Sequence, residues 1–322
     1  MKIALLTGGY DQEREVSLKS AQTWQDFLSA AWEKIEIFVL PQDEQKVIKE
    51  AKGFDLIVPV IHWKGWEDGY IISKILSKGA KVPYLFSPPE VMKITFDKAK
   101  TNEIVQKLNL TLKVPEFEKI DKNKDLDKAI SKLAKYPKLI LKPNQWGSSF
   151  DTFVLDFEGA KTLKSFIFKI LNQHNEDFLL QQFVPIKHEF SASIFWDRNQ
   201  NPKVLWITHI QYKKAFFDYE AKYEGASVET HYLMDEFAQK FGFDAAKVQE
   251  KDLLTIYQKL KIRTLARIDF VQDHQGNFWF LEINTIPGFT PASIYPSVAK
   301  KFFGNLVKFW KEVKKPIASS QT

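Results

Sequence analysis

Residues 265–284 read LARIDFVQDHQGNFWFLEIN. Two apolar runs flank a polar turn around Gly276, a pattern that is typical of a β-hairpin. Because side chains alternate between the two faces of a strand, the hairpin should have one buried face and one polar face. The predicted buried face consists of Ile268, Phe270, Leu281 and Ile283. The predicted polar face consists of Arg267, Asp269, Glu282 and Asn284.

The two acids of the polar face should lie opposite each other. A turn centred on Gln275 and Gly276 places Asp269 across from Glu282. Like charges that face each other across strands are destabilising, and close carboxylates resist joint ionisation. A hard divalent cation removes this penalty, and Mg²⁺ takes oxygen ligands from one or two carboxylates plus substrate phosphates. The alternative is a solvated polar face on which Arg267 neutralises one acid, and the pattern alone leaves both interpretations open.

The residues after the hairpin add a longer signature. Residues 284–291, Asn-Thr-Ile-Pro-Gly-Phe-Thr-Pro, form a turn-rich exit that can bring backbone N–H groups close to a bound anion. From the hairpin onward the chain resembles the D-alanine–D-alanine ligase family of the ATP-grasp superfamily. That family's C-terminal signature is Arg-x-Asp, a short hairpin, then Glu-x-Asn-Thr-x-Pro-Gly-x-Thr, and the match here is nearly complete.

This resemblance assigns roles to the polar face. It implies that two Mg²⁺ ions, or Mn²⁺ in their place, bind to Asp269, Glu282 and Asn284 and bridge the phosphates of ATP. It also implies that Arg267 and the N–H of Gly288 stabilise the oxyanion of a tetrahedral intermediate, as the donors of an oxyanion hole do.

Composition limits the class of protein. The chain has 322 residues, of which 44% are hydrophobic and 27% are charged, a balance that is ordinary for a globular protein of two or three lobes. No apolar run has transmembrane length, so we expect no membrane partner. The absence of cysteine excludes disulfides and a cysteine nucleophile, and makes the cytoplasm the default compartment. A net charge of +6 suits an anionic ligand such as a nucleotide, but no basic stripe with interleaved aromatics points to nucleic acid.

We expect an α/β fold (α+β overall) of ATP-grasp type with an N-terminal Rossmann-like domain. The predicted domains are 1–95, 96–188 and 189–322, the last two being the central and C-terminal ATP-grasp lobes. In the first domain, strands at 2–6, 35–40, 56–61 and 82–86 alternate with helices at 16–32 and 69–78, which predicts a parallel sheet. The C-terminal lobe has no clear period at 213–235, which is expected to be a lid loop, and a single helix is expected at 296–313.

Two lysines and a serine-containing loop are candidates for binding phosphate. Lys98 follows Asp97, an N-cap candidate, and Lys142 ends a strand, although either lysine alone fits a surface charge. The resemblance implies that Lys98 and Lys142 contact the phosphates of ATP. The segment Gly-Ser-Ser at 147–149 resembles the family's phosphate-covering loop, which assigns Ser148 and Ser149 to the nucleotide.

The stretch LLQQFV at 179–184 resembles the adenine-binding connector of the family. This implies that Gln181, Phe183 and Val184 contact the base and that Glu189 holds the ribose hydroxyls. The family usually has glutamate at position 181, so the side-chain contact to the adenine amino group is expected to differ here.

Two segments, residues 8–18 and 62–69, indicate where the first amino-acid substrate binds. Residues 8–18 resemble the family's N-terminal signature, which implies that Glu13 binds the ammonium group of the first D-alanine. Ser148 and Tyr223 are implied to hold that substrate in place. Residues 62–69 resemble the family's His-Gly-x-x-Gly-Glu-Asp-Gly segment, which implies a substrate contact for His62.

The same resemblance indicates the residues of the lid and of the binding site for the second substrate. Residues 218–223 resemble the family's mobile lid, in which Lys222 meets the transferred phosphate. A tyrosine at position 223 is associated with D-alanine, rather than D-lactate, as second substrate. Residues 293–296 resemble the stretch that contacts the second D-alanine, with Ser293 at its carboxylate and Ile294 beside it.

The implied reaction is ATP-dependent ligation of two D-alanines through an acyl phosphate, for peptidoglycan precursor synthesis. The expected partners are D-alanine and ATP, and the resemblance also allows a homodimer. One alternative is another ATP-grasp ligase for different amino or hydroxy acids, since Trp63, Trp66 and Asp151 depart from the family pattern. A second alternative is a nucleotide-binding or nucleic-acid-binding protein with a decayed ligase site.

Overall fold

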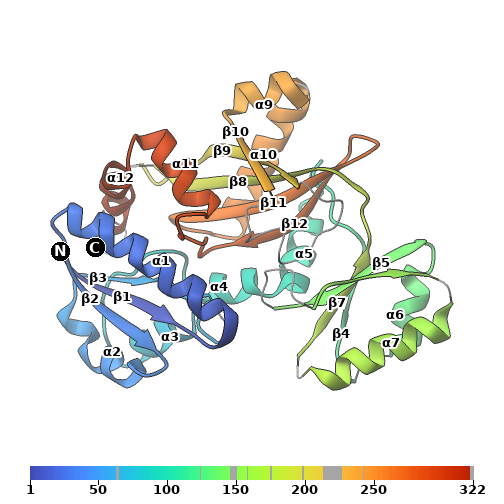
Figure 1. The fold of residues 1–322 in the computed structure, drawn as a ribbon, viewed down its shortest axis with the longest axis horizontal. Helices are drawn as coiled ribbons and strands as arrows, with labels where there is room; N and C mark the ends of the chain where they lie inside the picture. The colour runs from blue at the N-terminus through green and yellow to red at the C-terminus, as the bar shows by residue number, and fades with distance from the viewer. Residues whose placement is uncertain are drawn as a thin grey trace.

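The computed structural model describes residues 1–62, 65–123, 125–145, 151–157, 159–174, 176–197, 199–212, 227–241 and 243–319. The described residues form three sheets, one parallel and two antiparallel (Figure 1). Within the described part of the chain, no helix is long and apolar enough to cross a membrane.

The N-terminal sheet is parallel and has the strand order β2-β1-β3. Its elements are β1 (Lys2–Gly8), α1 (Asp11–Ala30), β2 (Lys34–Leu40), α2 (Glu44–Glu50), β3 (Leu56–Pro59) and α3 (Tyr70–Ser77). The alternation of strands and helices confirms the predicted parallel sheet. The fourth strand predicted at 82–86 is wrong, because this segment forms only an isolated bridge between Tyr84 and Ile57. Pro83 has no N–H to donate, and Phe86 adopts a φ of 75° that turns the chain away from the sheet.

The central sheet is antiparallel, with the order β4-β7-β5-β6. Its elements are β4 (Phe117–Ile120), α6 (Leu126–Leu133), β5 (Lys138–Pro143), β6 (Phe153–Asp156), α7 (Ala160–Gln173) and β7 (Phe178–Gln182). Helices α6 and α7 cover one face of this sheet (Figure 1), where Leu139 and Leu141 enter the core with Ile130 and Ile167. Since side chains alternate along β5, Lys142 lies on the opposite face.

The C-terminal sheet has five antiparallel strands in the order β10-β9-β8-β11-β12. Its elements are β8 (Ile186–Trp196), β9 (Pro202–Tyr212), β10 (Ser227–Tyr232), α9 (Met234–Phe241), α10 (Phe243–Lys259), β11 (Leu265–Asp273) and β12 (Phe278–Asn284). The prediction of a loop throughout 213–235 is wrong for β10. This edge strand carries Glu229, Thr230 and His231, so it lacks the apolar alternation by which strands are recognised.

Two short helices connect the sheets. Helix α4 (Pro89–Phe96) and helix α5 (Lys98–Lys107) meet at Asp97. Val91 of α4 and Val105 of α5 belong to the hydrophobic core of the C-terminal sheet, together with Phe270 and Phe280. Helix α5 therefore packs beneath β12 although it precedes the central sheet in sequence (Figure 1). The domain boundaries at 95/96 and 188/189 stay predictions.

The single helix predicted at 296–313 is wrong. The chain forms α11 (Ile294–Phe303) and α12 (Leu306–Ser319) instead. Gly304 adopts a φ of 82° between them, a left-handed conformation that ends a helix and that glycine takes without steric cost. The break lets α12 fold back beside α11, next to α1 (Figure 1).

An aromatic cluster joins the first and last parts of the chain. The ring of Trp24 on α1 lies 4.8 Å from that of Phe289 and 6.2 Å from that of Trp310 on α12, measured between centroids. The Oγ of Ser20 on α1 accepts a hydrogen bond of 3.0 Å from the backbone N–H of Phe289. This cluster fixes the start of the chain against the loop that follows the last hairpin.

The hairpin of β11 and β12 has the predicted register from Arg267 to Asp269 but not nearer the turn. Asp269 pairs with Glu282, as predicted, and Phe270 pairs with Phe280. A bulge between these pairs leaves Leu281 as an extra residue, so Phe280 is fully buried and Leu281 is only half-buried. The prediction that Leu281 faces the core is therefore wrong, since a bulge shifts the alternation by one residue.

Because of this bulge, truncation of Phe280 and truncation of Leu281 should lower the free energy of unfolding by unequal amounts. Phe280→Ala should lower the free energy of unfolding by about 3–5 kcal/mol, because it opens a cavity in a closed core. Leu281→Ala should cost about 1 kcal/mol or less, because part of that side chain already contacts water. Urea unfolding of both variants measures the difference, and equal costs would contradict the bulged register.

Glu33 closes the junction between α1 and α12. Its carboxylate accepts hydrogen bonds from Lys314, Trp310 and the amino terminus, at 2.7, 2.9 and 2.7 Å. Burial opposes ionisation of Glu33, but these donors outweigh it and lower its pKa from 4.5 to about 2. Since the pKa is depressed in the folded protein, the stabilisation is complete above pH 4.5 and is lost as the pH falls towards 2.

Glu33→Gln should therefore lower the free energy of unfolding at pH 7 by about 3 kcal/mol and flatten its dependence on pH in this acidic window. The control is Glu15→Gln, which removes an exposed carboxylate that also pairs with a lysine, Lys19, at 2.7 Å. Chemical unfolding at several pH values measures the effect. Wild-type acid sensitivity in the Glu33 variant would contradict the assignment.

Candidate active site

A row of polar side chains crosses the C-terminal sheet on one face. Directly paired residues of a sheet share a face, and one residue from each strand contributes to this row. In order from β10 to β12 the polar row consists of His231, Thr208, Ser191, Asp269 and Glu282. The next row on the same face consists of Trp206, Ser193, Arg267 and Asn284. The predicted polar face of the hairpin is therefore one end of a polar surface that spans the sheet.

Asp269 is held by two neighbours on this face. The Nε and a terminal nitrogen of Arg267 donate to its two oxygens at 3.0 and 2.8 Å, and the Oγ of Ser191 donates at 2.7 Å. The ion pair that the solvated-face alternative predicts is thus present. However, the side chains of Arg267 and Asp269 are only 23% and 14% exposed, so the pair is largely withdrawn from solvent.

The negative charge of Glu282 is balanced by a lysine of helix α5. The Nζ of Lys98, at the start of α5, lies 3.5 Å from Glu282 Oε2. The Oδ1 of Asn284 accepts a hydrogen bond from the N–H of Ile286 at 2.9 Å, which shapes the exit from β12. A small pocket opens between these groups and is lined by Glu67, Thr95, Phe96, Lys98, Glu282, Ile283, Asn284 and Thr285.

The oxygen atoms of Asp269, Glu282 and Asn284 are suitable ligands for a hard divalent cation. Asp269 and Glu282 are opposed carboxylates, and Asn284 adds an amide oxygen, which are the ligand types that Mg²⁺ prefers. Among the described residues, no cluster of three or more His, Asp and Glu side chains forms a complete cage. The protein would therefore supply part of a coordination shell, as is usual for Mg²⁺ sites that share their ion with phosphates.

Glu67 lines the same pocket, although the sequence pattern predicted no role for it. Burial raises its pKa well above the usual value, and the nearby charges of Glu13 and Glu282 reinforce the shift. Gly69 permits the turn that presents Glu67, because its φ is 83° and a Cβ there would lie 2.6 Å from the Cα of Pro89. The acid within the matched segment 62–69 was the signal that could have found it.

His62 is buried at the end of the segment that follows β3. Burial and the nearby charge of Arg267 lower its pKa to about 4, so the ring is neutral at neutral pH. Its backbone N–H donates to Ser17 Oγ at 2.9 Å, and Ser17 in turn donates to the carbonyl of Glu13 at 3.0 Å. These bonds bring the first turn of α1, with Glu13, beside His62, and the substrate contacts of both residues stay predictions.

Trp63 and Trp66 differ from the family pattern in segment 62–69, and the structure describes one of them. Trp66 is buried in the core of the N-terminal sheet, and its ring packs edge-on against Tyr70 at 5.6 Å. Trp66 therefore contributes to the core of the N-terminal domain. Trp63 lies outside the described residues.

The predicted adenine connector lies at the end of β7. Gln181 is 2% exposed, and its Nε2 has no hydrogen-bond partner among the described residues. The N–H of Phe183 donates to the carbonyl of Lys138 at 3.2 Å, and Val184 is buried. Glu189, on β8, is also buried and pairs with Val271, so it shares the face of Ser191 and Asp269 two residues along each strand.

Gly288 and Ser293 lie together after β12. A Cβ on Gly288 would come within 3.1 Å of Ser293 Oγ. That oxygen accepts a hydrogen bond from the N–H of Thr290 at 3.0 Å, so the loop folds onto the start of α11. Ile294 begins this helix and is half-buried.

The predictions for Ser148, Ser149, Lys222 and Tyr223 lie outside the described residues and are untested by the geometry. The polar row also contains three residues for which the sequence predicted no role, namely Ser191, Thr208 and His231. The signal for Ser191 was available, since small polar and apolar residues alternate from Phe190 to Ile194.

Sequence comparison now decides the family. A family model described as the D-ala D-ala ligase C-terminus matches residues 104–307. A D-alanine–D-alanine ligase from Acinetobacter baumannii is 33% identical over 307 residues, which cover 93% of this chain and 90% of that protein. The chain belongs to the D-alanine–D-alanine ligase family. A D-alanine–D-alanine ligase from Clostridium botulinum is 29% identical over 302 residues, with 93% and 92% of the two chains covered.

Solved structures show the same fold. A D-alanine–D-alanine ligase from Bacillus anthracis superposes with a TM-score of 0.80 at 24% identity, over 100% of this chain and 98% of that chain. A D-Ala:D-Ser ligase from Enterococcus faecalis superposes with a TM-score of 0.76 at 20% identity, over 98% and 99% of the chains. The expected family and the α/β, ATP-grasp fold class are both confirmed.

Proposed function

We propose that this D-alanine–D-alanine ligase family member joins two D-alanine molecules at the expense of ATP, for peptidoglycan precursor synthesis. The observation that carries the proposal is the opposition of Asp269 and Glu282 on a largely buried polar face, with Arg267 and Lys98 as their cationic partners. Opposed acids with cations beside them form a site for phosphates and the divalent ions that accompany them. The 33% identical relative from Acinetobacter baumannii supports the same activity.

ATP would lie between the central and C-terminal sheets. Lys98 and Lys142 would contact its phosphates, and Ser148, Ser149 and Lys222 would join them from outside the described residues. Gln181, Phe183 and Val184 would hold the adenine base, and a side-chain amide can accept from the adenine amino group through its oxygen. Glu189 would hold the ribose hydroxyls.

Two divalent ions, Mg²⁺ or Mn²⁺, would be held by Asp269, Glu282 and Asn284. When bound, they would neutralise charge on the transferring phosphoryl group. Around them, Arg267 keeps Asp269 oriented, and Lys98 does the same for Glu282.

The amino acids would bind where the N-terminal and C-terminal parts of the chain meet. Glu13 would accept from the ammonium of the first D-alanine, beside neutral His62, with Ser148 and Tyr223 completing that site. The carboxylate of this D-alanine takes the γ-phosphoryl group of ATP, which forms an acyl phosphate and releases ADP. The amine of the second D-alanine, held by Ser293 and Ile294, then attacks the acyl carbon and phosphate leaves.

Arg267 and the N–H of Gly288 would stabilise the oxyanion that forms in this attack. Donors fixed in place before the reaction cost no reorganisation when charge develops. Arg267 is fixed by Asp269, and the loop that carries Gly288 is fixed by the hydrogen bond from the N–H of Thr290 to Ser293 Oγ. We further propose that the chain acts as a homodimer in the cytoplasm, where ATP is supplied.

The deciding experiment is phosphate release from ATP in the presence of Mg²⁺ and D-alanine, with mass analysis of the product. We expect D-alanyl-D-alanine. Because a D-Ala:D-Ser ligase shares the fold, D-serine and D-lactate are offered in parallel as second substrates. Release that requires one of these other acids would replace the proposed substrate pair, and no release with any of them would contradict the ligase reaction.

Glu282→Gln should abolish product formation while leaving the fold intact. The amide keeps the size of the side chain but removes the charge that a divalent ion and Lys98 require. The matched control is Glu36→Gln, a carboxylate on β2 that pairs with Lys46 at 3.0 Å and is 35% exposed, close to the 31% of Glu282. Near wild-type turnover in the Glu282 variant would remove the metal assignment.

Gly288→Ala should raise the KM for the second D-alanine about tenfold or more and leave the KM for ATP close to its original value. The new methyl group would press on Ser293 Oγ, which lies 3.1 Å from its position. Initial rates with each substrate varied separately measure both constants. An increase confined to the KM for ATP would show that Gly288 does not border the second amino-acid site.

A further inference from the structure

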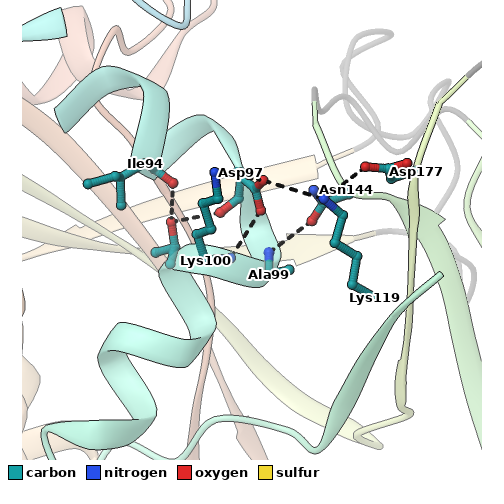
Figure 2. Close-up of polar contacts among 8 residues, drawn as sticks. Ile94, Asp97, Ala99, Lys100, Lys119, Asn144 and Asp177 are labelled. Atoms are coloured by element: carbon teal, nitrogen blue, oxygen red, sulfur yellow. Dashed lines mark hydrogen bonds and ion pairs between the residues drawn. The ribbon is translucent and has the colours of Figure 1, made fainter. Parts of the chain in front are cut away.

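The start of helix α5 is capped by two residues that lie far apart in sequence (Figure 2). The Oδ1 of Asp97, directly before the helix, accepts from the N–H of Lys100 at 3.0 Å. The Oδ1 of Asn144 accepts from the N–H of Ala99 at 2.9 Å, and its backbone carbonyl accepts from the N–H of Lys98 at 3.0 Å. Asp97 and Asn144 thus satisfy the first three N–H groups of α5, which a helix leaves without partners.

Asn144 is itself fixed in the central sheet. It directly follows β5, its side chain is fully buried, and its backbone N–H donates to the carbonyl of Asp177 at 2.9 Å. Lys119 of β4 joins the carboxylates of Asp177 and Asp97, at 2.8 and 3.9 Å (Figure 2). The junction therefore binds the end of β5 to the start of α5 by both main-chain and side-chain bonds.

This junction connects the two proposed phosphate lysines. Lys142 stands two residues before Asn144 on β5, and Lys98 is the first residue of α5. Lys98 is also paired with Glu282 of the C-terminal sheet at 3.5 Å. Asn144 consequently sets the spacing between a lysine of the central sheet and a lysine attached to the C-terminal sheet.

The capping pattern also limits how α5 can bind an anion. Helix N-termini bind phosphate through unsatisfied N–H groups, but here those of Lys98, Ala99 and Lys100 already have acceptors. Any contribution of α5 to phosphate binding must then come from side chains, and Lys98 is the lysine of this helix that faces Glu282 of the polar row. Such a contribution depends on where the helix begins, and thus on Asn144.

A cap alone does not explain an asparagine at this position. The Nδ2 of Asn144 is buried and has no acceptor among the described residues. A buried donor without a partner is destabilising, so its retention calls for an explanation beyond stability.

We propose that Asn144 is a positioning residue that holds Lys98 and Lys142 at the separation needed to bind one polyphosphate. The inference rests on the proposed function, since it requires that both lysines contact the nucleotide. It predicts that loss of the Asn144 side chain weakens contacts to phosphate and leaves contacts to the base and the ribose unchanged.

The test compares ADP with adenosine, each titrated into the full-length protein with Mg²⁺ in a calorimeter. Asn144→Ala should weaken ADP binding about tenfold and change adenosine binding less than about twofold. Equal losses for the two ligands, or no loss for ADP, would overturn the proposal. If the wild-type protein binds neither ADP nor adenosine, the proposed ATP-dependent function fails. If the wild-type protein binds both but Asn144→Ala causes no selective loss for ADP, only the role of Asn144 fails.

The matched control is Asp125→Ala. Asp125 caps α6 through a hydrogen bond of 3.1 Å from the N–H of Lys128, and it lies in the same lobe. Its loss should reduce stability as a lost cap does while ADP binding stays unchanged. A parallel loss of ADP affinity in this control would show that any weakening of the lobe is sufficient, and would overturn the specific role of Asn144.

Two further variants show whether Asn144 acts through Lys98. In a Lys98→Met background, Asn144→Ala should change ADP affinity less than about twofold, because the lysine that it positions is gone. A full tenfold effect in that background would contradict the mechanism. If Asn144→Ala does not fold, Asn144→Ser takes its place, since its shorter side chain cannot reach Ala99 and should give the same selective loss for ADP.

Discussion

The opposition of Asp269 and Glu282 across the last hairpin is the constraint on which the polar part of the molecule depends. Arg267 and Ser191 hold the first carboxylate, and Lys98 pairs with the second. Asp269 is largely withdrawn from water and therefore depends on its partner Arg267, whereas Glu282 keeps part of its contact with solvent beside Lys98. Because Lys98 begins α5, the start of that helix becomes part of the same electrostatic unit as a hairpin that lies far away in sequence.

The aromatic cluster around Trp24, Phe289 and Trp310 brings the two halves of the proposed amino-acid site together. Glu13 and His62 come from the N-terminal part of the chain, whereas Arg267 and Ser293 come from its end. The nearby charge of Arg267 acts on His62, which shows how closely these parts approach. A shared core of this kind makes the geometry of the amino-acid site depend on the packing of the N-terminal and C-terminal parts of the chain.

Much of the hairpin could be predicted because strand alternation and turn residues act over a few residues. The pairing of Asp269 with Glu282 was predicted from a turn centred on Gln275 and Gly276, but in the structure the bulge brings these two residues opposite each other. The errors arose where a local rule changed over one or two residues. A bulge moved Phe280 into the core in place of Leu281, and Gly304 divided a continuous apolar pattern into two helices. Strand β10 did not follow from the sequence because Glu229, Thr230 and His231 interrupt the apolar alternation that is typical of a strand.

The sequence by itself determined the family signature, the polar and apolar faces of the hairpin and the alternation of strands and helices at the start of the chain. These features depend on neighbours in sequence, whose geometry is set by the period of each element. Only the tertiary structure decided that Lys98 pairs with Glu282, that Glu67 belongs to the site and that Asn144 caps α5. Such contacts join residues far apart along the chain, and they are fixed by how the sheets and helices pack, which no local pattern specifies.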